Sequence, residues 1–158
     1  MNYLPIFVST GGCRAIVVGG GLLAEAKCRA LLKTAAEVVL FCQEPTPVML
    51  QWRDECRLQL ETRACDVSDL QTARLVYAAS ECDHDNTRIA QLSKEAAVWV
   101  NVVDCPDACD FITPAIVDRD PVVVAIGTEG TAPVLAQQIK LDVESMLPIH
   151  LGVVACGA

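Results

Sequence analysis

Short apolar runs alternate with stretches of helical periodicity along most of this chain, and this alternation constrains the fold more than any other feature. The five runs are residues 14–18, 37–42, 58–62, 74–79 and 98–103. Between them, apolar residues recur at three- and four-residue spacing, as at Leu23, Ala26 and Ala30. Strands and helices that alternate with short links typically build a parallel sheet. The sequence therefore predicts an α/β fold, a parallel sheet covered by helices on both faces.

Three consecutive glycines directly follow the first apolar run. Residues 19–24 read Gly-Gly-Gly-Leu-Leu-Ala, which fits the pattern G-x-G-x-x-A between a predicted strand and a predicted helix. In that pattern the glycines allow a tight turn and a close approach of the backbone to a pyrophosphate, and the helix N-terminus offers free N–H groups. A plain tight turn is the alternative. The setting favours a Rossmann-type dinucleotide site at Gly19, Gly20 and Gly21.

The end of the second run bears on the choice of cofactor. A Rossmann site places a carboxylate on the ribose about twenty residues after the glycines, or an arginine where the cofactor has a 2′-phosphate. Glu44 is the only carboxylate near the end of this run. Because no arginine is close in the sequence, we expect NAD rather than NADP.

The fifth apolar run leads into a single carboxylate, Asp104. It comes just past the carboxyl end of a predicted strand, at the edge where open α/β sheets bind ligands. A carboxylate there could act as a general base or bind a metal ion. It could equally cap the bend at Cys105 and Pro106, and its position alone does not decide.

After Pro106 the pattern changes. Residues 111–117 and 122–126 are extended apolar runs joined by a turn at residues 118–121, which predicts a hairpin. A helix is expected from about residue 131 to residue 146, with its apolar residues in one stripe. A hairpin and helix outside a complete sheet domain commonly pack on a partner subunit.

The composition excludes several classes of protein. Hydrophobic residues make up 53% of the 158, which excludes disorder, yet no run is long enough for a membrane span. The net charge of −8 argues against nucleic acid as a partner. Nine cysteines without a recognisable signal peptide indicate reduced thiols and a cytoplasmic location.

Several short motifs occur together in a known order. They are Met1–Phe7, Gly19–Gly21, Asn101–Asp104, Pro114–Arg119, Ala132–Ala136, Leu147-Pro148 and His150–Gly152. In their order and spacing the chain resembles the siroheme synthase N-terminal module, the precorrin-2 dehydrogenase and sirohydrochlorin ferrochelatase family. The resemblance extends from Met1 to about Gly152.

This resemblance implies an activity and a set of site residues. Members of the family oxidise precorrin-2 to sirohydrochlorin with NAD, and can then insert ferrous iron as a substrate metal to give siroheme. Asp104 matches the residue that serves both steps, as acid/base group and at the metal. The NAD contacts would fall at Leu22, Leu23, Gln43 and Glu44. A catalytically weak NAD- or tetrapyrrole-binding dimer, acting through a partner or as a redox sensor, stays open as an alternative.

The resemblance also implies an organisation of the chain. Residues 1–112 would form the NAD-binding domain, residues 113–148 the dimerisation region of a homodimer, and residues 149–158 a short tail. Arg119 and Lys140 are candidate cations for the anionic tetrapyrrole. Thr128 matches a serine that is phosphorylated in some relatives. The methyltransferase module of the trifunctional family members is not expected in 158 residues.

Two further clusters allow a metal site or a plain structural role. Asp83, His84, Asp85 and Asn86 lie at the start of a predicted helix, where capping of N–H groups is favoured over metal binding. Cys105 and Cys109 flank Asp107 close to Asp104, and could bind ferrous iron. A pair of thiols in such a loop is more often incidental.

Overall fold

The computed structural model describes residues 1–148, which fall into two compact units. Residues 7–111 form one unit, and Met1–Ile6 group with the residues from Ile112 onward in the other. The expected tail, residues 149–158, and the motif His150–Gly152 lie outside the described residues. Within residues 1–148, no helix has the length and apolar character needed to cross a membrane.

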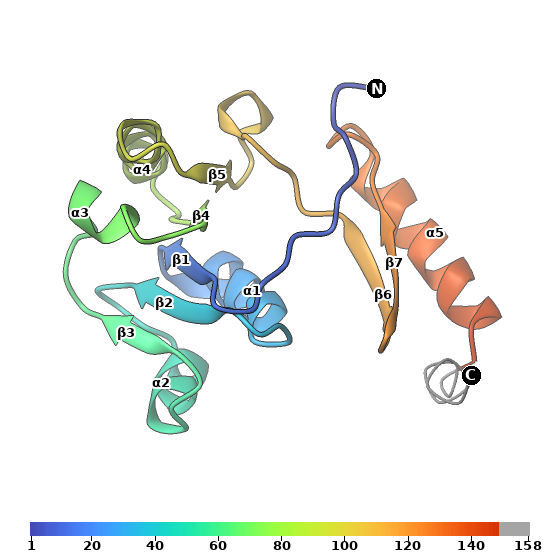
Figure 1. Cartoon of the computed structure of the whole chain (residues 1–158), viewed down its shortest axis with the longest axis horizontal. Helices are drawn as coiled ribbons and strands as arrows, with labels where there is room; N and C mark the ends of the chain where they lie inside the picture. Colours follow the sequence, from blue (N-terminus) through green and yellow to red (C-terminus); the bar gives the residue numbers. More distant parts are fainter. Residues whose placement is uncertain (149–158) are drawn as a thin grey trace. The chain divides into compact units, whose positions relative to one another are not determined.

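The larger unit is built on a five-stranded parallel sheet (Figure 1). Its strands are β1 (Arg14–Val18), β2 (Glu37–Phe41), β3 (Gln59–Glu61), β4 (Leu75–Ala78) and β5 (Trp99–Val102). The strand order is β3-β2-β1-β4-β5, so the order reverses between β1 and β4. Ligands of open α/β sheets bind in the crevice at such a reversal, at the carboxyl ends of the strands. The predicted Rossmann-type sheet is confirmed.

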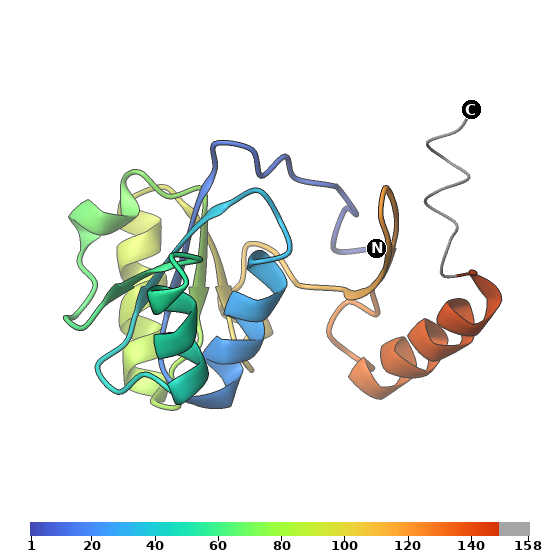
Figure 2. The ribbon, with the colours of Figure 1, turned by 90° about the horizontal axis from the view of Figure 1, so that it is seen from below.

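Helices cover both faces of this sheet, as the sequence predicts (Figure 2). They are α1 (Gly21–Leu31), α2 (Pro47–Asp54), α3 (Val67–Leu70), α4 (Asp83–Glu95) and the short 3-10 helix η1 (Pro106–Ala108). Alternate residues of each strand face opposite sides. Val17 packs in the apolar cluster that includes residues of α1 and α2, and Ile16 in the cluster that includes residues of α3 and α4. Both faces of the strand are thus buried, which explains its continuous apolar sequence.

The smaller unit contains an antiparallel hairpin and a helix. The hairpin pairs β6 (Ala115–Arg119) with β7 (Val122–Ile126), and α5 (Pro133–Met146) follows. The sequence predicts that the first hairpin strand begins at Phe111, but in the structure it begins at Ala115. Phe111 belongs to the larger unit, where its ring meets the Tyr77 ring edge-on at 5.3 Å between centroids.

Candidate functional site

The first part of the site is the turn between β1 and α1. Gly19 has φ +138°, and a Cβ atom there would lie 2.3 Å from the carbonyl oxygen of Ala79. Only glycine fits where two backbone segments approach so closely. The turn after β1 is thereby held against the loop after β4, on the two sides of the strand reversal.

Gly20 leaves room for a ligand at the N-terminus of α1. A Cβ atom on Gly20 would lie 3.2 Å from Sγ of Cys42 and 3.3 Å from the carbonyl oxygen of Glu44. No side chain caps the helix here, and its first turn holds no acidic residue. Ala24 is fully buried, as the third position of the pattern requires. These features fit the pyrophosphate of a dinucleotide.

A cleft of about 410 Å³ opens at the carboxyl ends of β1 to β4. Among the residues predicted to bind NAD, it is lined by Gly19, Gly20, Gln43 and Glu44. The structure therefore brings together residues from two strand ends, as the sequence predicts. Gly21, Leu22 and Leu23 form the first turn of α1, next to Gly20 but outside the lining of this cleft.

Two arginines line the same cleft, so the expectation that no arginine lies near the ribose end is wrong. Arg63 follows β3 by two residues, and Arg88 lies on α4, where it donates a 2.8 Å hydrogen bond to the carbonyl oxygen of Cys65. Arg63 is distant from Glu44 in sequence, but β3 pairs with β2, so both strands end at the same edge. The signal that could have found Arg63 is its position just past the third apolar run, which corresponds to that of Asp104 after the fifth.

The loop between β4 and α4 is held by Asn86. Its side chain accepts a hydrogen bond from the N–H of Ser80 and donates one to the carbonyl oxygen of Ser80, both at 2.9 Å. The expected capping by this Asp-rich stretch is wrong in detail: α4 begins at Asp83, its N-cap is Cys82, and no side chain caps it. Asp83 and Asp85 instead lie in the first turn, where negative charge favours the helix dipole.

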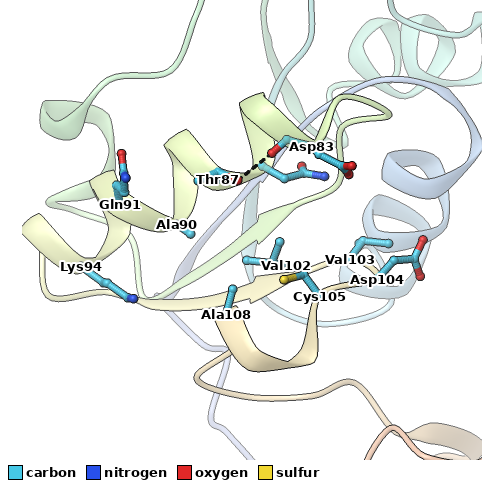
Figure 3. A pocket seen from close by; sticks show the side chains of 11 residues that line it. Asp83, Thr87, Ala90, Gln91, Lys94, Val102, Val103, Asp104, Cys105 and Ala108 are labelled. Carbon is cyan, nitrogen blue, oxygen red and sulfur yellow. Dashed lines mark hydrogen bonds between the residues drawn. The ribbon is translucent and has the colours of Figure 1, made fainter.

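Asp104 lies beside a second cleft, of about 280 Å³, between α4 and the loop after β5 (Figure 3). The residue has φ +59° and follows the last residue of β5 by two positions. Thr87, Gln91 and Lys94 line this cleft from α4. In Figure 3 the carboxyl group of Asp104 points away from α4. Asp104 thus belongs to the same ligand-binding edge of the sheet as the glycine turn.

Lys27 of α1 is a cation that interacts electrostatically with Asp104. Its ammonium lies 5.4 Å from the centroid of the Tyr77 ring. Burial lowers the pKa of Lys27, although the charges of Cys109 and Asp104 act in the opposite direction. The sequence alone does not single out Lys27, because its burial depends on how α1 packs on the sheet.

The thiol of Cys109 is occupied by the backbone of β5. Its Sγ accepts a hydrogen bond from the N–H of Val102 at 3.1 Å and donates to the carbonyl oxygen of Val102 at 3.2 Å. Burial raises the pKa of Cys109, so its thiolate is disfavoured. Among residues 1–148, no three His, Cys, Asp or Glu side chains form a group that could hold a metal ion.

The remaining predicted residues belong to the smaller unit. The guanidinium of Arg119 donates to the carbonyl oxygens of Glu144 at 3.3 Å and Leu147 at 3.4 Å, at the C-terminal end of α5. Lys140 lies 3.8 Å from a carboxylate oxygen of Glu144. Thr128 is half-buried, and its carbonyl oxygen accepts the hydroxyl of Thr131 at 2.7 Å.

Comparisons with known proteins agree with this architecture. A family model described as "Putative NAD(P)-binding" matches residues 6–115. The siroheme synthase of Methylococcus capsulatus is 38% identical over 155 residues, 98% of this chain and 33% of that protein. A siroheme synthase of Escherichia coli is 39% identical over 155 residues, 98% of this chain and 34% of that protein.

A solved structure shares the fold. It is "SirC, precorrin-2 dehydrogenase", with a TM-score of 0.75 and 19% identity, over 95% of this chain and 74% of that one. The resemblance to siroheme synthase is confirmed, although the chain spans about a third of the length of the curated relatives that it matches. By the match over residues 6–115, the chain belongs to the NAD(P)-binding family that this model describes.

Proposed function

We propose that this chain oxidises precorrin-2 to sirohydrochlorin with NAD. The observation that carries the proposal is the placement of a glycine cradle and a carboxylate, Asp104, along one edge of a parallel sheet whose strand order reverses between β1 and β4. The similarity to siroheme synthases and the fold of a precorrin-2 dehydrogenase support the choice of substrate.

The reaction removes two hydrogens from the substrate. When bound, NAD accepts one of them with two electrons as a hydride and becomes NADH. The other leaves as a proton, and we assign its removal to the carboxylate of Asp104. Gly19 and Gly20 keep the turn close to the cofactor, and Lys27 offers a cation to the acidic substrate at the same edge of the sheet.

A second step, insertion of ferrous iron into sirohydrochlorin, would release two protons from the macrocycle. Asp104 is the proposed acceptor and the proposed contact for the incoming metal, which is a substrate here. Cys109 is a poor ligand because its thiol bonds to the backbone of β5. Sirohydrochlorin with ferrous iron is therefore a separate assay.

Substrate charge is the main constraint on a chain of net charge −8. We propose that Arg119 contributes more than Lys140 to binding the tetrapyrrole carboxylates. Within residues 1–148, the partners of Arg119 are backbone carbonyl oxygens and no carboxylate pairs with it, whereas Lys140 is paired with Glu144. Thr128 stays a proposed phosphorylation site, where a phosphate would add charge beside Glu129.

We also propose that two copies associate through the smaller unit. Its helix α5 leaves large apolar side chains in solvent: Val134 is 81% exposed and Met146 78% exposed. The apolar strand residues Ile116 and Val123 are exposed as well. Exposed apolar side chains in such number on one small unit favour an interaction surface. From the many cysteines, we continue to predict a cytoplasmic location.

The test is anaerobic turnover of precorrin-2 with NAD, followed by the absorbance of sirohydrochlorin. Wild type should form product, Asp104→Ala should form little, and both should bind NAD alike. Asp107→Ala is the matched control, because it removes an exposed carboxylate of the same loop. A wild-type chain that binds NAD and yields no sirohydrochlorin would instead support the catalytically weak binding dimer.

A further inference from the structure

The cofactor cleft contains an arginine at the position where a cofactor with a 2′-phosphate would need one. Arg63 lines the cleft together with Gln43 and Glu44. β3 and β2 run parallel, with Glu61 paired to Phe41, so Arg63 leaves its strand at the same edge as Gln43. By position alone, this arginine would favour NADP.

The contacts of Arg63 indicate the opposite. Nη1 donates to Oδ2 of Asp69 at 2.7 Å, and Nη2 donates to Oδ1 of Asp69 at 2.6 Å. Nη1 also donates to the carbonyl oxygen of Ala64 at 3.1 Å. Such a bidentate pair of a guanidinium with a carboxylate is among the strongest hydrogen-bonded interactions of an arginine. Nε lies 3.6 Å from Oε2 of Glu61, and the guanidinium carbon lies 5.0 Å from the centroid of the Phe41 ring.

Asp69 is itself held in place. Its Oδ2 accepts the N–H of Asp66 at 2.9 Å, which closes the capping box of α3. Its side chain is only 13% exposed, against 51% for Arg63. Because its bond to the N–H of Asp66 fixes the carboxylate of Asp69, we take Asp69 to set the position of the Arg63 side chain.

Charge around Arg63 therefore disfavours a phosphate. Asp69 and Glu61 place two carboxylates on one guanidinium, and Glu44 and Asp85 add two more to the lining of the same cleft. The second arginine of the lining, Arg88, lies on α4 and donates to the carbonyl oxygen of Cys65. A 2′-phosphate would bring a further charge of about −1.5 to −2 into this surrounding. We infer that Asp69, by holding Arg63, is a positioning residue that makes the cleft select NAD over NADP. This inference rests on the proposed function, in that it requires the cleft to bind a dinucleotide.

The experiment is equilibrium binding of NAD and of NADP to the purified chain, by calorimetry and without turnover. Wild type should bind NAD at least about tenfold more tightly than NADP. Asp69→Asn keeps the size of the side chain and removes its charge. It should raise the affinity for NADP about tenfold and leave that for NAD within about twofold, because a freed guanidinium can pair with the phosphate.

Three variants control this result. Asp54→Asn makes the same change in an exposed carboxylate that pairs with Arg53 on α2, outside the cleft, and should alter neither affinity. Adding Arg63→Gln to Asp69→Asn should remove the gain for NADP. Glu61→Gln leaves the cap of α3 untouched and should raise NADP affinity by a smaller factor, so the inference can be tested even where Asp69→Asn folds poorly.

Two results would overturn the inference: equal binding of NAD and NADP by wild type, or no gain for NADP in either Asp69→Asn or Glu61→Gln. A folded wild-type chain that binds neither cofactor would overturn the proposed function as well. The two failures are therefore distinguishable in a single set of titrations.

Discussion

The carbonyl oxygen of Ala79 occupies the space that a side chain on Gly19 would need, with only 2.3 Å between that oxygen and the position of a Cβ atom. The contact joins the turn after β1 to the loop after β4, and Gly19 and Ser80 of these two segments both line the larger cleft. Asn86 strengthens the same loop through its two hydrogen bonds to Ser80. The cradle is therefore a product of tertiary packing as well as of local sequence.

Replacing Gly19 should damage the fold before it affects the cofactor. Gly19→Ala combines a strained φ with overlap between backbone segments, and should lower the free energy of unfolding by about 3 kcal/mol or more. Thermal and denaturant unfolding measure this loss. An unchanged unfolding free energy would contradict the close approach of the two segments.

Gly20→Ala is the matched comparison, because its added methyl group meets Cys42 and Glu44 at 3.2–3.3 Å and its backbone is extended. We expect the free energy of unfolding to stay within about 1 kcal/mol of wild type. Affinity for NAD should fall about tenfold, since the methyl group enters the path of the pyrophosphate. Titration of both variants with NAD separates folding from binding.

Arg119→Gln should affect both stability and substrate binding. Losing the hydrogen bonds to the end of α5 should cost about 1–2 kcal/mol of unfolding free energy, and the KM for precorrin-2 should rise severalfold with little change in kcat. Lys140→Gln, which removes from α5 a cation that is paired with Glu144, should leave KM within about twofold of wild type. Equal effects of the two substitutions on KM would refute the distinction between them.

Acid should destabilise the larger unit through the carboxylates around α3. The hydrogen bond from Arg63 lowers the pKa of Asp69, and hydrogen bonds from Ser68 and Asp69 lower the pKa of Asp66. A carboxylate whose folded pKa lies below its unfolded value of about 3.9 stabilises the fold above that pH, and this contribution is lost as the pH falls through the folded pKa. Melting temperatures measured from neutral pH downward should fall less steeply for Asp69→Asn than for wild type. Parallel curves would show that this carboxylate does not contribute.

Reactivity of the thiols should divide sharply in the native protein. Burial raises the pKa of Cys28 and of Cys65 to about 12, so almost no thiolate forms at mildly alkaline pH. Cys56, Cys82 and Cys105 are exposed. A thiol-alkylating reagent with mass-spectrometric readout should label Cys56, Cys82 and Cys105 first, and Cys28 and Cys65 only on unfolding. Early labelling of Cys28 would mean that α1 does not pack on the sheet as described.

The central strands of the sheet, β1, β2 and β4, are predictable because both of their faces are buried. Every residue of β1 after Arg14 is apolar and buried, so this run stands out against the mixed helices. The carboxyl edge follows from strand polarity alone, and the sequence pattern is therefore enough to place the glycine turn and Asp104 along it.

Other features depend on pairing between distant segments. Arg63 becomes part of the cleft only because β3 pairs with β2. Its hydrogen bonds to Asp69 require the formation of α3, a helix of four residues without a clear sequence pattern. An apolar residue such as Phe111 would suit the hairpin as well as the larger unit. The sequence pattern therefore does not predict that its ring packs on Tyr77. The start of α4 differs from the expected one because aspartates suit both an N-cap and a first turn.

The most direct test of NAD-dependent oxidation at Asp104 is the stoichiometry of a single anaerobic reaction with precorrin-2, in which NADH and sirohydrochlorin are measured together. We predict that the two products appear in equal amounts and at the same rate, and that Asp104→Asn slows both while Asp107→Asn slows neither. Sirohydrochlorin formed without NADH, or a chain that binds NAD and forms neither product, would contradict this mechanism.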